Sequence, residues 1–406
     1  MACETPVGND VLLDPIETLR ELIATASVNP MDRGDWGPPY GEDRLTDLLE
    51  SLLQRIGLRT ARQPVAAGRE NLVGLLEGPT SAERGGRLIL LDAHQDTVPV
   101  DGMTIAPFVP EMREGRVYGR GACDTKGGMA AMLAAVARLA QQRPPGMPSI
   151  LLACTVNEEY GFTGAVKLTE LFEPGSGGIV PRRPDAALIA EPTALDVVVA
   201  HKGMVRWRCH TRGRAAHSAH PERGENAIYR MASVLASLEE YAAEVAPRTG
   251  SHPLCGPATL SVGTIQGGVS VNTVPDLCTI EIDRRLPPGE DAREAREAAI
   301  EYVASAVGAD FHVEHDPPYL SGPALSDADN GPLAERLMAV AREVTGPRRR
   351  VGVPYGTHAA VYAADGVPSV VWGPGSIEQA HTRDEWISVD QVRTAAEVYY
   401  RFCRTR

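Results

Sequence analysis

The chain reads R-L-I-L-L-D-A-H-Q-D-T-V-P over residues 87–99, a mostly apolar run that ends abruptly in polar residues. Such a run is typical of a strand covered on both faces, as in a parallel sheet. Open α/β sheets bind ligands at the carboxyl ends of their strands. His94 and Asp96 follow this strand two residues apart, so the carboxylate could fix the imidazole tautomer. For this pair alone, a loop histidine beside a helix-capping aspartate explains the pattern equally well.

The same arrangement recurs along the chain. Further buried strands are predicted at residues 149–155, 186–190 and 369–372, and polar residues follow each of them. The acids and the histidine in question are Glu158, Glu159, Glu191 and His381. Each alone is a weak signal, and a lone Glu-Glu pair is better explained as a solvated turn. Together with His94 and Asp124 they would gather at one sheet edge, and so many nitrogen and carboxylate ligands indicate more than one metal ion.

The glycine-rich segment G-R-G-A-C-D-T-K-G-G at residues 119–128 opens a helix predicted over 127–141. It resembles a phosphate-binding loop, but its spacing is not G-x-G-x-x-G and its central acid would repel phosphate. Asp124, just before the helix, fits a helix N-cap or a metal ligand. Cys123 has no catalytic triad around it and is better explained as a small buried residue.

The length of 406 residues predicts two domains. Helices and strands alternate up to about His201, as in an α/β domain with a mainly parallel sheet. Strands at 205–212, 258–266 and 277–285, with helices at 225–242 and 291–307, then indicate an inserted α+β domain with an antiparallel sheet. The α/β pattern returns from about residue 320. We therefore predict a first domain over 1–201 and 318–406, interrupted by an inserted domain over 202–317.

The composition excludes several classes of partner. The net charge of −13, the sequence pI of about 5.3 and an aromatic content of 5% disfavour nucleic acid and anionic membranes. The sequence shows neither a secretory signal nor an apolar stretch long enough to span a bilayer. Seven scattered cysteines without a C-x-x-C pair favour reduced thiols. We expect a cytoplasmic protein.

Five segments together resemble a known family: H-Q-D-T-V-P, G-R-G-A-C-D-T-K-G-G, N-E-E, E-P and A-H-T-R-D-E-W. In this order they are similar to the co-catalytic zinc family of acetylornithine deacetylase, succinyl-diaminopimelate desuccinylase, aminoacylase and glutamate carboxypeptidase. The resemblance runs from about residue 15 to the C-terminus. It implies a zinc-exopeptidase-like catalytic domain over 1–201 and 318–406, and an inserted dimerisation, or lid, domain over 202–317.

The resemblance also implies two Zn²⁺ per chain, with Co²⁺ as a substitute. His94 and Glu191 would hold one ion, Glu159 and His381 the other, and Asp124 would bridge the two. Family members usually have a cis peptide bond after the bridging acid.

Catalytic roles follow from the same resemblance. Asp96 would orient His94, and Glu158 would be the general base that carries a proton from water to the leaving amine. His217 of the inserted domain would reach across a homodimer to stabilise the oxyanion.

The substrate contacts implied by the resemblance are Asn272, Arg285 and Thr357, although a surface ion pair would equally explain Arg285. One departure is His358, where relatives usually carry an acid, so the charge of the substrate pocket is in question.

The segment around His381 is most similar to the deacetylases and desuccinylases, so an N-acyl amino acid is the first expectation for the substrate. A dipeptidase or a glutamate-type carboxypeptidase is the second. A non-catalytic binding relative is disfavoured by Glu158, which a binder would not need. A nucleotide-binding protein would rest only on the glycines of residues 119–128.

Overall fold

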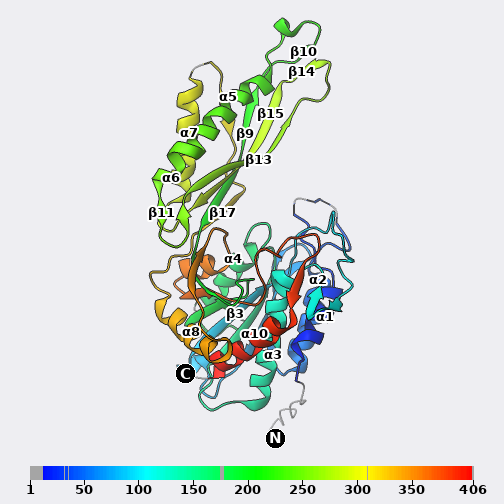
Figure 1. Ribbon diagram of the computed structural model, residues 1–406, viewed down its shortest axis with the longest axis vertical. Helices are drawn as coiled ribbons and strands as arrows, with labels where there is room; N and C mark the ends of the chain where they lie inside the picture. The colour runs from blue at the N-terminus through cyan, green and yellow to red at the C-terminus, as the bar shows by residue number, and fades with distance from the viewer. Residues whose placement is uncertain (1–11, 32, 35, 174–177, 309, 405–406) are drawn as a thin grey trace. The chain divides into compact units, whose positions relative to one another are not determined.

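The computed structural model describes residues 12–404 apart from 32, 35, 174–177 and 309 (Figure 1). The chain divides into two compact units. The larger unit comprises Met1–Val199, Asp327–Val351 and Thr357–Arg406, and the inserted unit comprises Ala200–Ser326 and Gly352–Gly356. The fold class predicted from the sequence, an α/β domain interrupted by an α+β insert, is confirmed.

An eight-stranded sheet forms the centre of the larger unit, in the order β1-β2-β6-β3-β7-β19-β8-β18. The four central strands run parallel and are β6 (Ser149–Thr155), β3 (Leu88–His94), β7 (Ala186–Ile189) and β19 (Ser369–Val371). The outer strands are β1 (Arg59–Ala66), β2 (Arg69–Leu76), β8 (Val197–His201) and β18 (Arg350–Val353). Since β1 and β2 pair antiparallel with their neighbours, as does β8 with β19, the sheet is mixed and parallel only at its centre.

Successive side chains of a strand point to opposite faces of the sheet, and both faces of this sheet are apolar. Helices therefore cover both faces. One layer contains α1 (Pro15–Ala24), α3 (Gly127–Gln142), α8 (Gly331–Thr345) and α10 (Val389–Arg404), which contact one another. Ile89 and Leu91 of β3 belong to the core that these helices close. Asp92 points to the opposite face, where α4 (Thr163–Thr169) and α9 (Ala359–Ala364) lie. The helix α2 (Asp43–Arg55) packs on β1 and β2.

The inserted unit is an antiparallel sheet in the order β13-β15-β9-β16, with β17 also paired to β9. Its strands are β9 (Gly203–Arg212), β13 (Thr259–Gly267), β15 (Leu277–Leu286), β16 (Val313–His315) and β17 (Leu320–Gly322). The helices α5 (Ala227–Glu240) and α7 (Ala292–Val307) cover it, around a separate core that includes Trp207 and Ile280.

The boundaries of the inserted unit differ from the predicted residues 202–317. The strand β17 still pairs with β9, through Leu320 opposite Arg206, so the unit continues to Ser326. Apolar alternation could not show this, because β17 is only three residues long. None of the helices found in residues 12–404, outside the gaps given above, is long and apolar enough to cross a membrane.

Candidate metal centre

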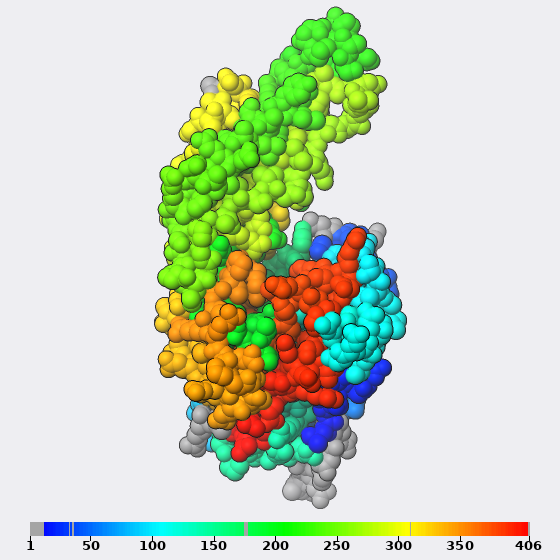
Figure 2. Space-filling model, viewed as in Figure 1, coloured from blue at the N-terminus to red at the C-terminus, as the bar shows by residue number. Residues whose placement is uncertain are grey.

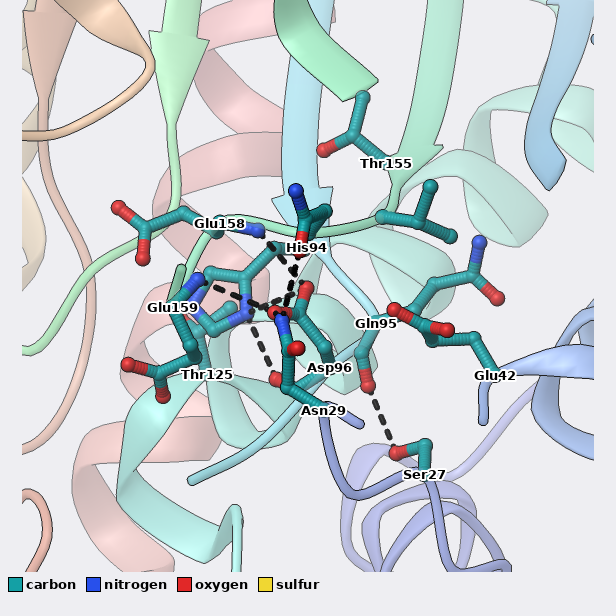
Figure 3. Close-up of polar contacts among 12 residues, drawn as sticks. Ser27, Asn29, Glu42, His94, Gln95, Asp96, Thr125, Thr155, Glu158 and Glu159 are labelled. Atoms are coloured by element: carbon teal, nitrogen blue, oxygen red, sulfur yellow. Dashed lines mark hydrogen bonds and ion pairs between the residues drawn. The ribbon is translucent and has the colours of Figure 1, made fainter. Parts of the chain in front are cut away.

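The candidate site lies at the carboxyl ends of the central parallel strands. His94 is the last residue of β3, Glu158 and Glu159 come shortly after β6, and Glu191 follows β7. Parallel strands end at the same edge of a sheet, so these side chains come together although up to 97 residues separate them along the chain. Asp124 comes from the turn before α3 (Ala122–Lys126), and His381 from the segment after β19. Figure 3 shows His94, Asp96, Glu158 and Glu159 at this edge.

Asp124 lies between two histidines. Its Oδ1 is 3.1 Å from Nε2 of His94, and its Oδ2 is 3.2 Å from Nε2 of His381. Glu191 Oε1 lies 3.9 Å from the same nitrogen of His94, and Glu159 Oε2 lies 3.2 Å from that of His381. Each oxygen of Asp124 therefore faces one histidine–glutamate pair, as a bridging carboxylate would. One ligand atom from each of His94, Asp124 and Glu159 lies within 4.8 Å of the others.

The donor set fits divalent cations. Glu159 Oε1 and Glu191 Oε1 are buried and, among the residues that the structure describes, have no hydrogen-bond partner. Burial, and then the neighbouring Asp124, raises the pKa of both Glu159 and Glu191. A buried carboxylate oxygen that lacks a hydrogen-bond partner is costly unless a cation neutralises it. Two imidazoles and three carboxylates around such a position are a typical zinc ligand set.

Asp96 organises the site in two ways. Its backbone oxygen, not its carboxylate, bonds His94 Nδ1 at 2.8 Å, whereas the carboxylate lies 3.8 Å from that nitrogen. Asp96 thus orients His94 as expected, but through its main-chain oxygen. The carboxylate instead accepts the backbone N–H groups of Glu158 and Glu159, both at 3.1 Å. Asp96 therefore fixes the loop that carries the two glutamates (Figure 3).

Glu158 differs from Glu159 in its surroundings. Its carboxylate makes no ion pair with His381, and the two side chains point in different directions (Figure 3). Burial raises the pKa of Glu158 well above its ordinary value, and the nearby Glu159, Asp124 and Asp96 raise it further against the opposing effect of His94. A buried carboxylate with a raised pKa takes up a proton more readily than an exposed one, and a general base must take up and return a proton.

Glu385, for which no role was predicted from the sequence, holds the Asp124 turn. Its Oε1 accepts the N–H groups of Cys123 at 2.8 Å and Asp124 at 3.0 Å. Its Oε2 accepts the N–H of Gly121 at 3.0 Å and Nη1 of Arg120 at 2.7 Å. The signal was present, because Glu385 lies four residues after His381 in A-H-T-R-D-E-W, but only the fold brings it to residues 120–124.

The Asp124 turn and Glu385, which holds it, come from distant parts of the chain. Strand β20 (Trp386–Ser388), next to Glu385, pairs with β5 (Arg116–Tyr118). On the face seen in Figure 2, residues near 385 accordingly lie beside residues near 115. The Asp124–Thr125 peptide bond is cis, as the resemblance implied.

His217 and Asn272 lie together at one end of the inserted unit (Figure 1). His217 is in β10 (Ala216–His217), which pairs with β14 (Thr273–Val274), and the N–H of Ser218 donates to the backbone oxygen of Asn272 at 2.9 Å. Arg285 of β15 makes an ion pair with Asp283 at 2.9 Å, the alternative considered from the sequence. The oxyanion and substrate roles of these residues remain predictions.

Thr357 and His358 are buried at the start of α9. Thr357 Oγ1 accepts the N–H of Ala359 at 3.2 Å, and a substrate contact for it remains a prediction. His358 Nδ1 lies 2.9 Å from Asp92 Oδ2 and 3.2 Å from Thr155 Oγ1. His358, which stands where relatives usually carry an acid, therefore contacts an acid of β3 inside the protein.

Comparison with known proteins identifies the family. Residues 90–405 match the profile of one family, described as peptidase family M20/M25/M40. The chain belongs to this family. M20 membership and the geometry above make it a metal-dependent hydrolase of amide bonds.

Two curated relatives of this M20 chain are both named acetylornithine deacetylase. The protein from Myxococcus xanthus is 31% identical over 383 residues, which cover 92% of this chain and 93% of the relative. The protein from Proteus mirabilis (strain HI4320) is 32% identical over 391 residues, which cover 94% of both.

Solved structures share the fold. A family M20 metallo-carboxypeptidase from Sulfolobus solfataricus aligns over 96% of this chain and 98% of its own, with a TM-score of 0.75 and 17% identity. A dinuclear metal-binding peptidase of the same family from Bacillus subtilis aligns over 96% of both chains, with a TM-score of 0.65 and 18% identity.

Proposed function

We propose that this M20 chain hydrolyses the amide bond of an N-acyl amino acid, using two zinc ions per chain for which cobalt can substitute. The observation that carries the proposal is Asp124, which faces His94 with one oxygen and His381 with the other, near the carboxylate of Glu158, whose pKa is raised. The substrate class is supported by the acetylornithine deacetylase relatives, which align over more than nine tenths of both chains.

The ligands divide into two sets that share Asp124: His94 with Glu191, and Glu159 with His381. Zinc held there supplies Lewis acidity toward an amide carbonyl and toward water. Glu158 takes a proton from the attacking water and returns it to the leaving amine, a role that its raised pKa favours. His217 donates a hydrogen bond to the oxyanion.

A dipeptidase or glutamate-type carboxypeptidase is the second candidate, because the family description names peptidases. The two candidates differ in the acyl portion of the substrate and share every residue of the metal centre. A binding protein without activity is disfavoured, because the full ligand set and Glu158 are all present at the site.

We further propose a homodimer formed through the inserted unit, which would allow His217 to act in the partner's site. Strand β13 is at the edge of its sheet, and its residue Ile265 is 53% exposed. Val269 and Val271 just beyond it are 93% and 100% exposed. An unpaired sheet edge with exposed apolar side chains is a typical interface.

Light scattering after size-exclusion chromatography tests the dimer. We expect a mass of twice 43.4 kDa for the parent protein and of a single chain for Ile265→Lys. A parent protein that elutes as a single chain at micromolar concentration would contradict the dimer.

The reaction is tested by amine release from zinc- or cobalt-loaded protein. The substrates are N-acetylornithine, N-succinyl-diaminopimelate, other N-acyl amino acids and dipeptides, each with and without a chelator. We expect turnover of one N-acyl amino acid class, abolished by the chelator and restored by added metal. Turnover confined to dipeptides would support the second candidate, and silence across the panel with two metals bound would reject both.

A further inference from the structure

A buried series of hydrogen-bonded side chains leads from the start of β2 to the loop that carries Glu158. Arg69, the first residue of β2, donates from Nε to Glu42 at 2.8 Å, and its Nη2 bonds the other oxygen of the same carboxylate. Its remaining nitrogen, Nη1, donates to Asn157 Oδ1 at 2.9 Å. Asn29 Nδ2 donates to the same oxygen at 3.0 Å and to Asp96 Oδ2 at 2.7 Å.

All five residues are buried, and Glu42, Asn29 and Asp96 have no exposed surface. Burying a charged pair is unfavourable unless its geometry and remaining hydrogen bonds are good. The fork between Arg69 and Glu42 meets this condition, and it leaves the Nη1 nitrogen of Arg69 to donate to Asn157. The Arg69–Glu42 pair thus makes a further hydrogen bond, to Asn157, that is not needed to neutralise its charges.

Arg69 fixes the orientation of the Asn157 amide, and this orientation agrees with the donor and acceptor roles of the next two residues, Asn29 and Asp96. A guanidinium can only donate, so it must face the oxygen of the Asn157 amide and not its nitrogen. With that oxygen fixed, the Asn29 amide must present its nitrogen there, and the same nitrogen reaches Asp96. The Asn157 nitrogen is turned to Thr163 Oγ1, to which it donates at 2.8 Å.

This series of hydrogen bonds ends at the loop that carries Glu158, the proposed general base. Asn157 directly precedes Glu158 and has a left-handed backbone, with φ of 64°. Asp96 accepts the N–H groups of Glu158 and Glu159. The loop is therefore held twice, through the side chain of Asn157 and through Asp96, and Arg69 acts on both.

We propose that Arg69, held by Glu42, is a positioning residue that aligns Glu158 through Asn157, Asn29 and Asp96. The proposal rests on the role of Glu158 proposed above. Arg69 touches neither a metal ligand nor Glu158. Because the same loop carries the proposed ligand Glu159, bound metal has to be measured beside turnover, and we expect the loss of Arg69 to affect the placement of the base more than metal binding.

The test compares Arg69→Lys with Arg62→Lys in the metal-loaded full chain. Lysine keeps the charge opposite Glu42 but lacks the planar fork that reaches Glu42 and Asn157 together. Arg62 lies on the neighbouring strand β1, where its Nη2 donates to both Asp47 and Glu50, at 2.7 and 2.6 Å, and it does not bond Asn157 or Asn29. We expect Arg69→Lys to lower kcat by about 10- to 100-fold, with KM and bound metal within twofold of the parent. Arg62→Lys should leave kcat unchanged.

A double-mutant cycle tests the route. If Arg69 acts through Asn29, the effects of Arg69→Lys and Asn29→Ala on kcat should not multiply, and the double variant should resemble the worse single one. If the effects of the two substitutions on kcat multiply, the proposed route through Asn29 is wrong. A kcat of Arg69→Lys within twofold of the parent, or a loss of activity that only follows a loss of metal, would overturn the positioning role.

Hydrogen exchange gives a readout independent of turnover. The peptide that contains the amides of Glu158 and Glu159 should exchange faster in Arg69→Lys, and peptides of α3 should not change. Unchanged exchange at this peptide rejects the inference even if the chain proves active. If the parent protein is inactive on every substrate, only the proposed function is rejected. The exchange measurement still tests whether Arg69 holds the loop of Glu158.

Discussion

Glu158→Gln should keep its metal and lose nearly all turnover. Glutamine has almost the same shape as glutamate but cannot accept and return a proton, and general acid–base groups contribute about 10²- to 10⁴-fold to rate. The proposed metal ligands His94, Asp124, Glu159, Glu191 and His381 are untouched. We therefore expect kcat to fall by about that factor, while metal analysis of the purified variant matches the parent.

Glu170→Gln is the matched control for this substitution. Glu170 lies downstream of the same loop, where its exposed carboxylate pairs with Lys167 at 2.8 Å. Its loss should not change kcat. Retained turnover in Glu158→Gln at full metal content would rule out Glu158 as the base, and lost metal would instead reassign Glu158 as a ligand.

Glu385→Gln should destabilise the protein and weaken metal binding. The carboxylate accepts four hydrogen bonds, from Arg120 and from three backbone N–H groups, and it is fully buried. An amide turns its NH₂ group toward two of these donors and leaves the buried Arg120 charge uncompensated. Breaking one partner of a buried ion pair costs about 3–5 kcal/mol. Urea unfolding of the metal-free protein measures this loss, and metal titration measures the weakened affinity.

Glu397→Gln provides the comparison at the surface. Glu397 pairs with Arg138 at 2.6 Å, close to the 2.7 Å of Glu385 and Arg120, but both side chains are partly exposed. Exposed pairs contribute about 0–1 kcal/mol. Equal destabilisation by the two substitutions would show that burial of Glu385 does not matter, and unchanged metal affinity in Glu385→Gln would remove its role in holding Asp124.

Much of this fold could be predicted from local sequence. The apolar runs of β3, β6, β7 and β19 marked the central strands, because strands buried on both faces need no polar alternation. Strands β1 and β2 were not predicted: R-T-A-R-Q-P-V-A in β1 carries little apolar signal, whereas β2 ends in an apolar run that was not assigned to a strand. Strand β1 is held by its pairing with β2 and not by its own composition.

The ligand residues could be proposed from their positions at strand ends, since parallel strands bring such ends together whatever the separation along the chain. A cytoplasmic location and the oxyanion role of His217 remain predictions from the sequence.

The sequence by itself determined the α/β fold class, the family resemblance and the candidate metal ligands, because these depend on residue type and spacing near single strands. Only the tertiary structure decided which groups support the ligands. Glu385 clamps the turn of Asp124 from more than 250 residues away, His358 faces Asp92 in the interior, and Arg69 reaches Asp96 only through two asparagines. Directed hydrogen bonds between distant segments leave no periodic pattern in the sequence, so folding alone brings these partners together.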